Sequence, residues 1–389
     1  MESEEQNKKS IWVFAVASFL NDVGYYLVTV IWPVFVTVTL GASTAFLGFI
    51  DGFGDALASI SQSLSGFLSD KLKKRKIFIW LGYLSASLSR FIYAASYVPW
   101  QVIPGKILDR GGKLRDAPRD AMVADIKKYE VRATAFGSLR AADRSGALLG
   151  LIASLFLITA LTQRQLFLIA ALPSLIGAVL IFIFIHEKNP KTDEKEKLSF
   201  SLRLASKNLK FFTVASAIFT LGAFTDSFYI LSAKTVGFSL EDITLLYGIF
   251  ILVSAVSAVP FGKLADKIGR KIVLLSAYLL FIVTNFFFAV ANSFWMFLLG
   301  FLIYGLHYGA YEGNLKTMVA DMSPKEFRAS FMGSFSTVMG LIALPASVIA
   351  GFLWQTVEFR APFVFSILLS VISLVVISFM KEGGREIST

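Results

Sequence analysis

The sequence has no cysteine and only two histidines, His186 and His307, among its 389 residues. Without cysteine the chain forms no disulfide and offers no thiolate for catalysis or metal binding. Two histidines are too few for a histidine-based metal centre, so we expect neither a metal site nor a cofactor. A phosphate-binding loop of the Gly-x-x-x-x-Gly-Lys-Ser/Thr type is also missing, so ATP is not the expected energy source. These absences argue against an enzyme.

Charged residues are scarce as well. Asp, Glu, Lys and Arg make up 16% of the chain, whereas ~25% is usual in soluble domains. Apolar residues make up 56%, and they recur in continuous runs of about 20 residues, each long enough to cross the hydrocarbon of a bilayer as a helix. Because the runs do not alternate as lipid-facing strands would, we predict an all-α membrane protein embedded in a lipid bilayer.

The apolar pattern predicts twelve transmembrane helices. The polar linker at 187–207 divides them into two sets of six, so the predicted domains are an N-terminal bundle, 1–186, and a C-terminal bundle, 208–389. The expected spans are 11–38, 44–68, 77–96, 99–125, 133–160, 165–186, 209–233, 241–264, 272–290, 293–320, 329–354 and 361–380.

The loops between these spans differ in charge. Loops after even-numbered spans, such as residues 70–76 and 187–207, are rich in Lys and Arg, whereas residues 39–43 and 96–98 carry no charge. Since basic loops stay in the cytoplasm, we predict that both termini are cytoplasmic and that the chain is a multi-pass protein of the cell (inner) membrane. The net charge of +10 is therefore explained by basic loops that fix the orientation of the chain in the membrane. We expect no nucleic acid partner.

The chain also repeats itself. A shift of 196 residues aligns "GFLSDKLKKRK", from Gly66, with "GKLADKIGRK", from Gly262, and "MVAD" at Met122 with "MVAD" at Met318. An even number of spans separates the copies, so the two halves have the same orientation. Two bundles related by a pseudo-two-fold axis along the membrane normal are therefore expected, with a site between them.

The Gly-x-x-x-Asp-basic loop resembles the signature loop of the major facilitator superfamily, and its second copy is similar. The resemblance implies a monomeric secondary transporter of a small-molecule substrate, in which this loop is a cytoplasmic latch that gates alternating access. Residues 106–125 and 137–150 resemble bacterial drug-efflux permeases, although the proline usual in their antiporter motif is missing. The gating candidates are Gly66, Asp70, Arg75, Arg119, Asp120, Gly262, Asp266 and Arg270.

Ionisable residues inside the predicted spans are candidates for proton coupling, because a charge at mid-bilayer is costly. Asp22 lies in the first span, and Asp51 and Asp55 lie one turn apart in the second. Two carboxylates on one helical face repel each other, which favours binding of a proton. The alternative is that these acids form ion pairs with the arginines of the fourth and fifth spans.

A second set of residues is predicted to line the substrate cavity. In the tenth span, aromatic and polar residues recur at helical spacing and form one face suited to an amphipathic ligand. The alternative is a packed interface with the eleventh span, and Arg140 and Asp143 can equally hold the bundle together. The cavity candidates are Tyr25, Arg115, Arg140, Asp143, Asp226, Tyr304, His307, Tyr308, Tyr311 and Glu312.

These patterns favour proton-coupled export of amphipathic drug-like compounds, with protons as the coupling ion. Transport of an organic anion or metabolite is the alternative, because the fourth and fifth spans hold seven basic and five acidic residues. A non-transporting receptor or scaffold is a further alternative, since the fold alone does not fix function.

Overall fold

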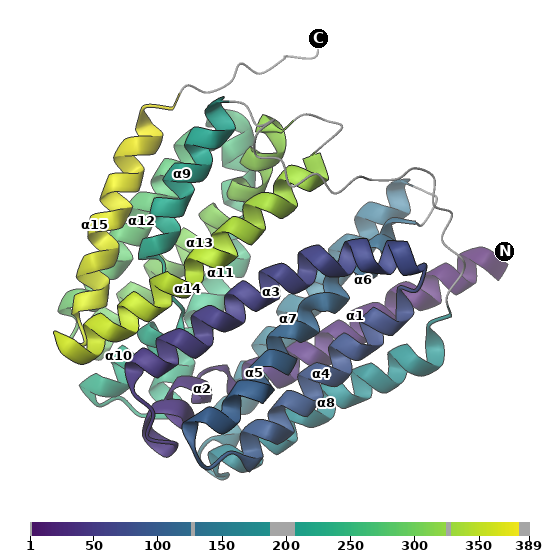
Figure 1. Cartoon of the computed structure of the whole chain (residues 1–389), viewed down its shortest axis with the longest axis horizontal. Helices are drawn as coiled ribbons and strands as arrows, with labels where there is room; N and C mark the ends of the chain where they lie inside the picture. The colour runs from purple at the N-terminus through teal and green to yellow at the C-terminus, as the bar shows by residue number, and fades with distance from the viewer. Residues whose placement is uncertain (1, 126–128, 187–206, 324–327, 381–389) are drawn as a thin grey trace. The chain divides into compact units, whose positions relative to one another are not determined.

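The computed structural model describes residues 2–125, 129–186, 207–323 and 328–380, and the regular structure in those ranges is helical (Figure 1). Apart from Lys207, the predicted linker lies outside the described residues. The helices group by contacts into two compact units. The first unit holds Met1–Ser43, Phe53–Glu196 and Gly237–Gly248, and the second holds Thr44–Gly52, Lys197–Val236 and Ile249–Thr389.

In the first unit, α1 packs against α7 and α8, and α4 packs against α8 and α5. Phe14, Tyr83 and Ile181 meet in its apolar core. The helices of the N-terminal half are α1 (Glu2–Thr29), α2 (Ile31–Val34), the π-helical turn η1 (Phe35–Thr39), α3 (Thr44–Leu72), α4 (Lys76–Ala95), η2 (Pro99–Gln101), α5 (Val102–Gly111), η3 (Gly112–Arg115), α6 (Asp116–Ala124), α7 (Tyr129–Leu157) and α8 (Gln163–Phe184).

In the second unit, α12 packs against α13 and α15, and α9 packs against α14 and α15. Aromatic rings fill much of its core, as where Phe219 stacks on Tyr278 with ring centres 4.0 Å apart. The helices of the C-terminal half are α9 (Lys207–Gly222), α10 (Ser227–Val236), α11 (Leu240–Ile268), α12 (Arg270–Val290), α13 (Phe294–Met322), α14 (Arg328–Thr356) and α15 (Ala361–Ser378).

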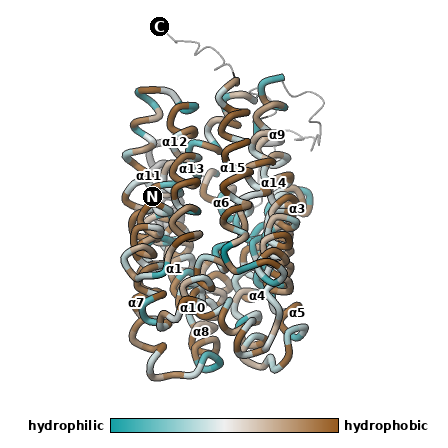
Figure 2. Tube along the Cα trace, turned by 90° about the vertical axis from the view of Figure 1, so that its left-hand side faces the viewer, coloured by the Kyte–Doolittle hydropathy of each residue, from teal (hydrophilic) through white to brown (hydrophobic). Residues whose placement is uncertain are grey.

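Nine segments of the described residues are long and apolar enough to span a membrane. Figure 2 shows hydrophobic residues along most of the length of these helices. The other three predicted spans fall on α3, on α5 to α6, and on α7, which are helical but carry more polar residues. The nine segments are Lys9–Thr29, Lys76–Ala95, Gln163–Phe184, Lys207–Val236, Leu240–Ile268, Arg270–Val290, Phe294–Met322, Phe331–Thr356 and Ala361–Ser378.

Three predicted spans are broken rather than continuous. The first is divided into α1, α2 and η1, the fourth into η2, α5, η3 and α6, and the seventh between α9 and α10. In the seventh predicted span Gly222 ends α9, and the Thr225 hydroxyl accepts a hydrogen bond from the Ser227 N–H at 3.4 Å, a local bond that competes with helix continuation. At this break the Thr225 N–H donates to the Ser347 hydroxyl of α14 at 3.3 Å.

The repeated Gly-x-x-x-Asp-basic loop has a residue with positive φ at the equivalent position of both copies. Lys73 has φ 54° and Gly269 has φ 100°, and these two positions are 196 residues apart. A left-handed residue is a common way to end a helix, and it suits Gly better than Lys. The turn geometry therefore supports the repeat inferred from the sequence.

Candidate functional site

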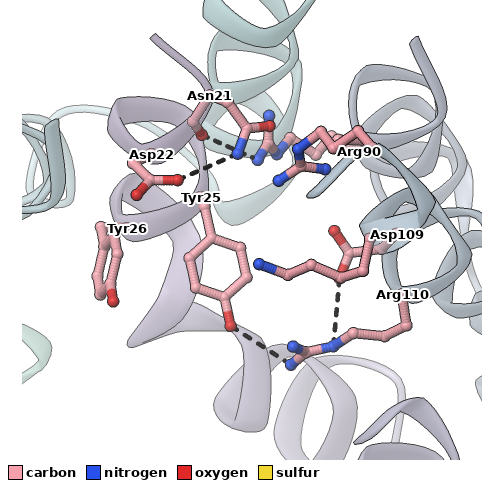
Figure 3. A pocket seen from close by; sticks show the side chains of 10 residues that line it. Asn21, Asp22, Tyr25, Tyr26, Arg90, Asp109 and Arg110 are labelled. Carbon is pink, nitrogen blue, oxygen red and sulfur yellow. Dashed lines mark hydrogen bonds and ion pairs between the residues drawn. The ribbon is translucent and has the colours of Figure 1, made fainter. Parts of the chain in front are cut away.

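A cavity of about 180 Å³ lies in the first unit, bounded by α1, α4, α5 and η3 (Figure 3). Tyr25 and Tyr26 form its aromatic side, with ring centres 5.2 Å apart. The remaining lining is strongly polar, with four basic and two acidic side chains. These charged residues are Asp22, Arg90, Asp109, Arg110, Lys113 and Arg115.

Gly82 of α4 and Gly112 of η3 allow these two helices to lie in close contact, and this contact positions Arg115. A Cβ on Gly112 would lie 2.8 Å from the Gly82 carbonyl oxygen, too close for any side chain. The neighbouring Gly111 has open space around its Cβ position. Gly111 and Gly112 both have negative φ, so alanine fits the backbone at either position and only the packing distinguishes them.

Gly112→Ala is therefore expected to destabilise the protein by about 1–3 kcal/mol, because overpacking moves η3 away from α4. Gly111→Ala is the matched control and should leave the melting temperature in detergent at or above that of the unmodified chain. Equal melting temperatures for the two variants would show that this contact does not hold η3 in place.

A hydrogen-bond chain joins Asp22 to Arg90 at one side of the cavity. The Asn21 Nδ2 donates to Asp22 Oδ1 at 3.1 Å, and the Ser174 hydroxyl donates to Asn21 Oδ1 at 3.1 Å. Arg90 Nη1 donates to that same Ser174 hydroxyl and to the Ala170 carbonyl at 2.9 Å. Arg90 Nη2 also reaches the Asn21 carbonyl at 3.4 Å, as Figure 3 shows. The side chains of α1 and α4 are thus linked through α8.

The other cations of the cavity have looser partners. Arg110 donates to the Tyr25 hydroxyl at 3.3 Å and lies 3.6 Å from Asp109 (Figure 3). Arg115 donates to the Gly112 carbonyl at 3.1 Å and lies over the Tyr83 ring. The Arg115 Nε is buried and has no hydrogen-bond acceptor in the described residues. The geometry therefore concentrates positive charge that the protein only partly compensates.

The three proton-coupling candidates have different surroundings. Asp22 lines the cavity. Asp51 is 2% exposed and belongs to the second unit, where it accepts hydrogen bonds from the hydroxyls of Ser227 at 2.5 Å and Thr225 at 3.3 Å. Asp55 belongs to the first unit and lies 3.8 Å from Arg110. Asp51 and Asp55 share a helix, but each has partners of its own.

The candidates of the tenth span lie in α13 of the second unit. The Tyr304 hydroxyl donates to Asp226 at 2.6 Å, in the break before α10. His307 is buried, with Nδ1 2.8 Å from the Ala277 carbonyl of α12, and its ring stacks with Tyr311. Tyr308 lies edge-on to Phe250 of α11, and Glu312 pairs with Lys316 at 3.0 Å. Tyr304 also contacts Tyr229 of α10, and Tyr311 contacts Phe219 of α9. None of the candidates of the tenth span lines the cavity described above.

Arg140 and Asp143 lie on α7 of the first unit. Arg140 is exposed, whereas Asp143 is half-buried and acts electrostatically on Asp22 of α1. A Cβ on Gly146, one turn after Asp143, would lie 3.2 Å from the Asp22 Cβ, so α7 and α1 are in close contact there. Asp143 is therefore a neighbour of the cavity rather than part of its lining.

The first copy of the repeated loop forms an ion-pair bridge at the end of α3. Arg75 donates to Asp70, in the last turn of α3, at 2.8 and 3.0 Å, and to Asp125, just after α6, at 2.5 Å. Burial acts to lower the pKa of Arg75, but its bonds to Asp70 and Asp125 raise that pKa above the ordinary value. The bridge joins three helix ends of the first unit, and Gly66 lies one turn before Asp70.

The second copy has a similar bridge in the second unit, although its arginine, Arg270, is equivalent to Lys74 rather than to Arg75 at the shift of 196 residues. Arg270 lies 4.0 Å from Asp266 and pairs with Asp321, the position 196 residues after Asp125. Gly262 precedes Asp266 by one turn of α11, as Gly66 precedes Asp70. Of the remaining gating candidates, Arg119 pairs with Asp120 at 3.0 Å and donates to the Ser18 hydroxyl at 2.8 Å.

Arg75→Gln is expected to destabilise the protein more than Arg270→Gln, because the Arg75 side chain is 12% exposed and that of Arg270 is 28% exposed. The control Lys74→Gln removes an exposed charge from the same loop and should change little. Thermal unfolding of the three variants in detergent measures the order. A larger loss for Arg270→Gln would show that the second copy is the stronger latch.

Sequence reasoning missed Arg90, Asn21 and Ser174. Of these three, only Arg90 could have been identified from the sequence, because it is the single charged residue of the predicted span 77–96. Asn21 and Ser174 are ordinary polar residues whose contact, across 153 positions, only the fold reveals. No group of three or more potential metal ligands is found among the described residues.

Comparison with known proteins gives consistent matches. The sequence profile of the Major Facilitator Superfamily matches residues 14–239 and 211–386. An uncharacterized MFS-type transporter of Methanocaldococcus jannaschii is 34% identical over 97% of this chain and 96% of its own length. The quinolone resistance protein NorA of Staphylococcus aureus is 30% identical over 39% of each chain. The crystal structure of a mutant of the nucleoside transporter NupG superposes with a TM-score of 0.82 at 14% identity, covering 96% of this chain and all of that one.

Proposed function

This chain belongs to the major facilitator superfamily, and we propose that it is a proton-coupled secondary transporter that moves a small organic solute by alternating access. The solute binds in the cavity of the first unit, and the proton binds at Asp22.

Family membership confirms the resemblance predicted from the sequence. Because the family consists of transporters, it also confirms that the chain is not an enzyme. The chain is a multi-pass membrane protein, and its partners are the bilayer and a small-molecule substrate.

The finer architecture is part of the proposal. The chain forms twelve spans in two six-helix bundles, 1–186 and 208–389, related by a pseudo-two-fold axis. It is a monomer of the cell membrane, with both termini in the cytoplasm. The similar bridges of Arg75 and Arg270, with Asp125 and Asp321 at equivalent positions, support this arrangement.

The surroundings of Asp22 are the observation that carries the proton coupling. Its carboxylate lines the cavity and accepts a hydrogen bond from Asn21, but no Lys or Arg nitrogen of the described residues lies within ion-pair distance. A carboxylate in a membrane without a cation in direct contact is costly to ionise, and proton uptake removes that cost. Asp22 can therefore bind and release a proton as the cavity changes its access.

Proton movement in liposomes tests this function. The purified chain is reconstituted with a pH-sensitive dye inside, and a panel containing benzoate, phenyl phosphate, benzylamine, ethidium and a neutral sugar is added outside without a pH gradient. We expect at least one compound to change the internal pH of liposomes that contain the protein but not of liposomes without protein. A panel that moves into the liposomes with no proton movement would contradict proton coupling.

Export of amphipathic drug-like compounds by proton antiport is a second candidate function. The partial similarity to NorA favours it. In that case a cationic compound and a proton compete for Asp22, so ethidium entry would drive protons out of the liposomes. Proton movement in the same direction as the solute would favour symport instead.

A further inference from the structure

Arg90 is a buried cation whose hydrogen-bonding capacity is only partly used. Its side chain is 2% exposed, and its acceptors are the Ala170 carbonyl, the Ser174 hydroxyl and the Asn21 carbonyl. A guanidinium has five N–H donors, so the Nε–H and one Nη2–H have no acceptor among the described residues. The Nε and Nη2 atoms share an edge of the guanidinium, and such an edge can bind carboxylate or phosphate through two parallel hydrogen bonds.

Arg90 also lacks a direct counter-charge. No carboxylate of the described residues lies within 4.0 Å of it, although Asp22 and Asp109 act on it from a greater distance. A buried charge without a paired ion is costly, and neutral acceptors compensate it only in part. An anion that enters the cavity would supply the missing partner.

Arg115 adds a second incompletely compensated cation to the same cavity. It is 5% exposed, its buried Nε has no acceptor, and the nearest oxygen of Asp116 lies 3.6 Å from that Nε, beyond a good hydrogen bond. Arg90 and Arg115 repel each other electrostatically. A bound oxyanion relieves this repulsion, because it is attracted by both guanidinium groups.

Resting on the proposed function, we propose that the cavity binds an oxyanion group of the transported solute, a carboxylate or a phosphate, on Arg90 and Arg115, and that a proton on Asp22 strengthens this binding. Tyr25 and Tyr26 accommodate the apolar body of the solute. The solute is thus an organic anion.

The coupling follows from charge. Ionised Asp22 repels an oxyanion in the cavity, and protonated Asp22 does not. The charged groups that act on Asp22 are Asp143 from α7 and Lys113 and Arg115 from η3, and Arg90 reaches it through Asn21 and Ser174. Proton uptake by Asp22 removes one negative charge from the cavity lining and so makes the cavity more positive. Anion and proton therefore bind together, which is the thermodynamic basis of symport.

Binding of defined anions to the purified full chain in detergent tests the proposal. The probes are benzoate, phenyl phosphate and the neutral isostere benzamide, and affinity is measured from thermal stabilisation at constant ionic strength, at an acidic and an alkaline pH. We expect one of the anions to bind, more tightly at acidic pH, and benzamide to bind weakly. Whichever anion binds better identifies the group as carboxylate or phosphate.

The variants Arg90→Gln and Arg115→Gln are each expected to weaken anion binding about tenfold or more. Arg90→Lys, which keeps the charge and loses the two-donor edge, should give an intermediate loss and covers the case in which Arg90→Gln does not fold. Arg360→Gln is the matched control in the second unit, since its Nε is also buried without an acceptor in the described part of the chain, and it should bind as the unmodified chain does.

Equal binding of benzamide, unchanged binding by the Arg90 and Arg115 variants, or no binding of either anion would overturn the proposal. These results do not depend on a proton gradient. If the anions fail to bind while liposomes still show solute-dependent proton movement, the proposed function stands and only the oxyanion site falls. If the anions bind but no proton moves, the proposed function fails instead.

Discussion

Asp22→Asn is expected to abolish accumulation of the solute against its gradient when a pH gradient drives transport, while exchange of solute down its own gradient continues. The asparagine keeps the hydrogen-bonding shape of Asp22 but binds no proton, so the solute still binds and the energy of the proton gradient is lost. Accumulation ratio and counterflow are measured in the same liposomes. We expect the ratio to fall to about one, the equilibrium value without coupling.

Asp55→Asn is the control for this result. Asp55 was an equal candidate in the sequence, but its carboxylate lies 3.8 Å from Arg110 and its side chain is 39% exposed. We therefore expect Asp55→Asn to retain accumulation. Loss of accumulation in Asp55→Asn with retention in Asp22→Asn would assign the proton to the second carboxylate.

Asp51→Leu is expected to slow transport about tenfold or more. Asp51 holds the start of α3 to the break between α9 and α10, through the hydroxyls of Thr225 and Ser227. Hydrogen bonds to a charged group contribute roughly 1.5–3 kcal/mol, which is enough to change the populations of two conformations at least tenfold. The rate of solute uptake and the proton-to-solute ratio are both measured.

Asp51→Asn separates the two possible roles of this residue. An amide still accepts hydrogen bonds from Thr225 and Ser227, so a positioning role predicts near-normal rate and an unchanged proton-to-solute ratio. Ser227→Ala should reproduce part of the Asp51→Leu effect, because it removes the shorter of the two bonds. A normal rate without proton coupling in Asp51→Asn would show that Asp51 carries the proton.

The large-scale features of this chain follow from sequence because they depend on composition. Long continuous apolar runs predict helices in lipid. The repeated Gly-x-x-x-Asp-basic loop marks equivalent positions of the two halves, and Lys73 and Gly269 there both have positive φ. The partner of the latch could not be derived in this way. Asp125 contacts Arg75 across 50 positions, and its counterpart Asp321 was recognisable only once that contact was known.

The cavity was predicted in part. Asp22, Tyr25 and Arg115 were candidates from the sequence, and all three line the cavity. Charged residues in a membrane span could be chosen from sequence because they usually face polar groups or cavities. The role of His307 could not be derived, since helical spacing places it on a polar face whereas packing against Ala277 and Phe281 buries it. Arg90 shows the converse, a single charge in an apolar span that becomes central once its neighbours are known.

Proton uptake on anion binding tests the coupled site most directly. Benzoate or phenyl phosphate is added to the purified chain in weakly buffered detergent solution containing a pH indicator, and the same titration is carried out with Asp22→Asn. The account predicts that the unmodified chain takes up protons as the anion saturates and that Asp22→Asn binds the anion without proton uptake. Proton release on anion binding, or equal uptake by Asp22→Asn, would contradict it.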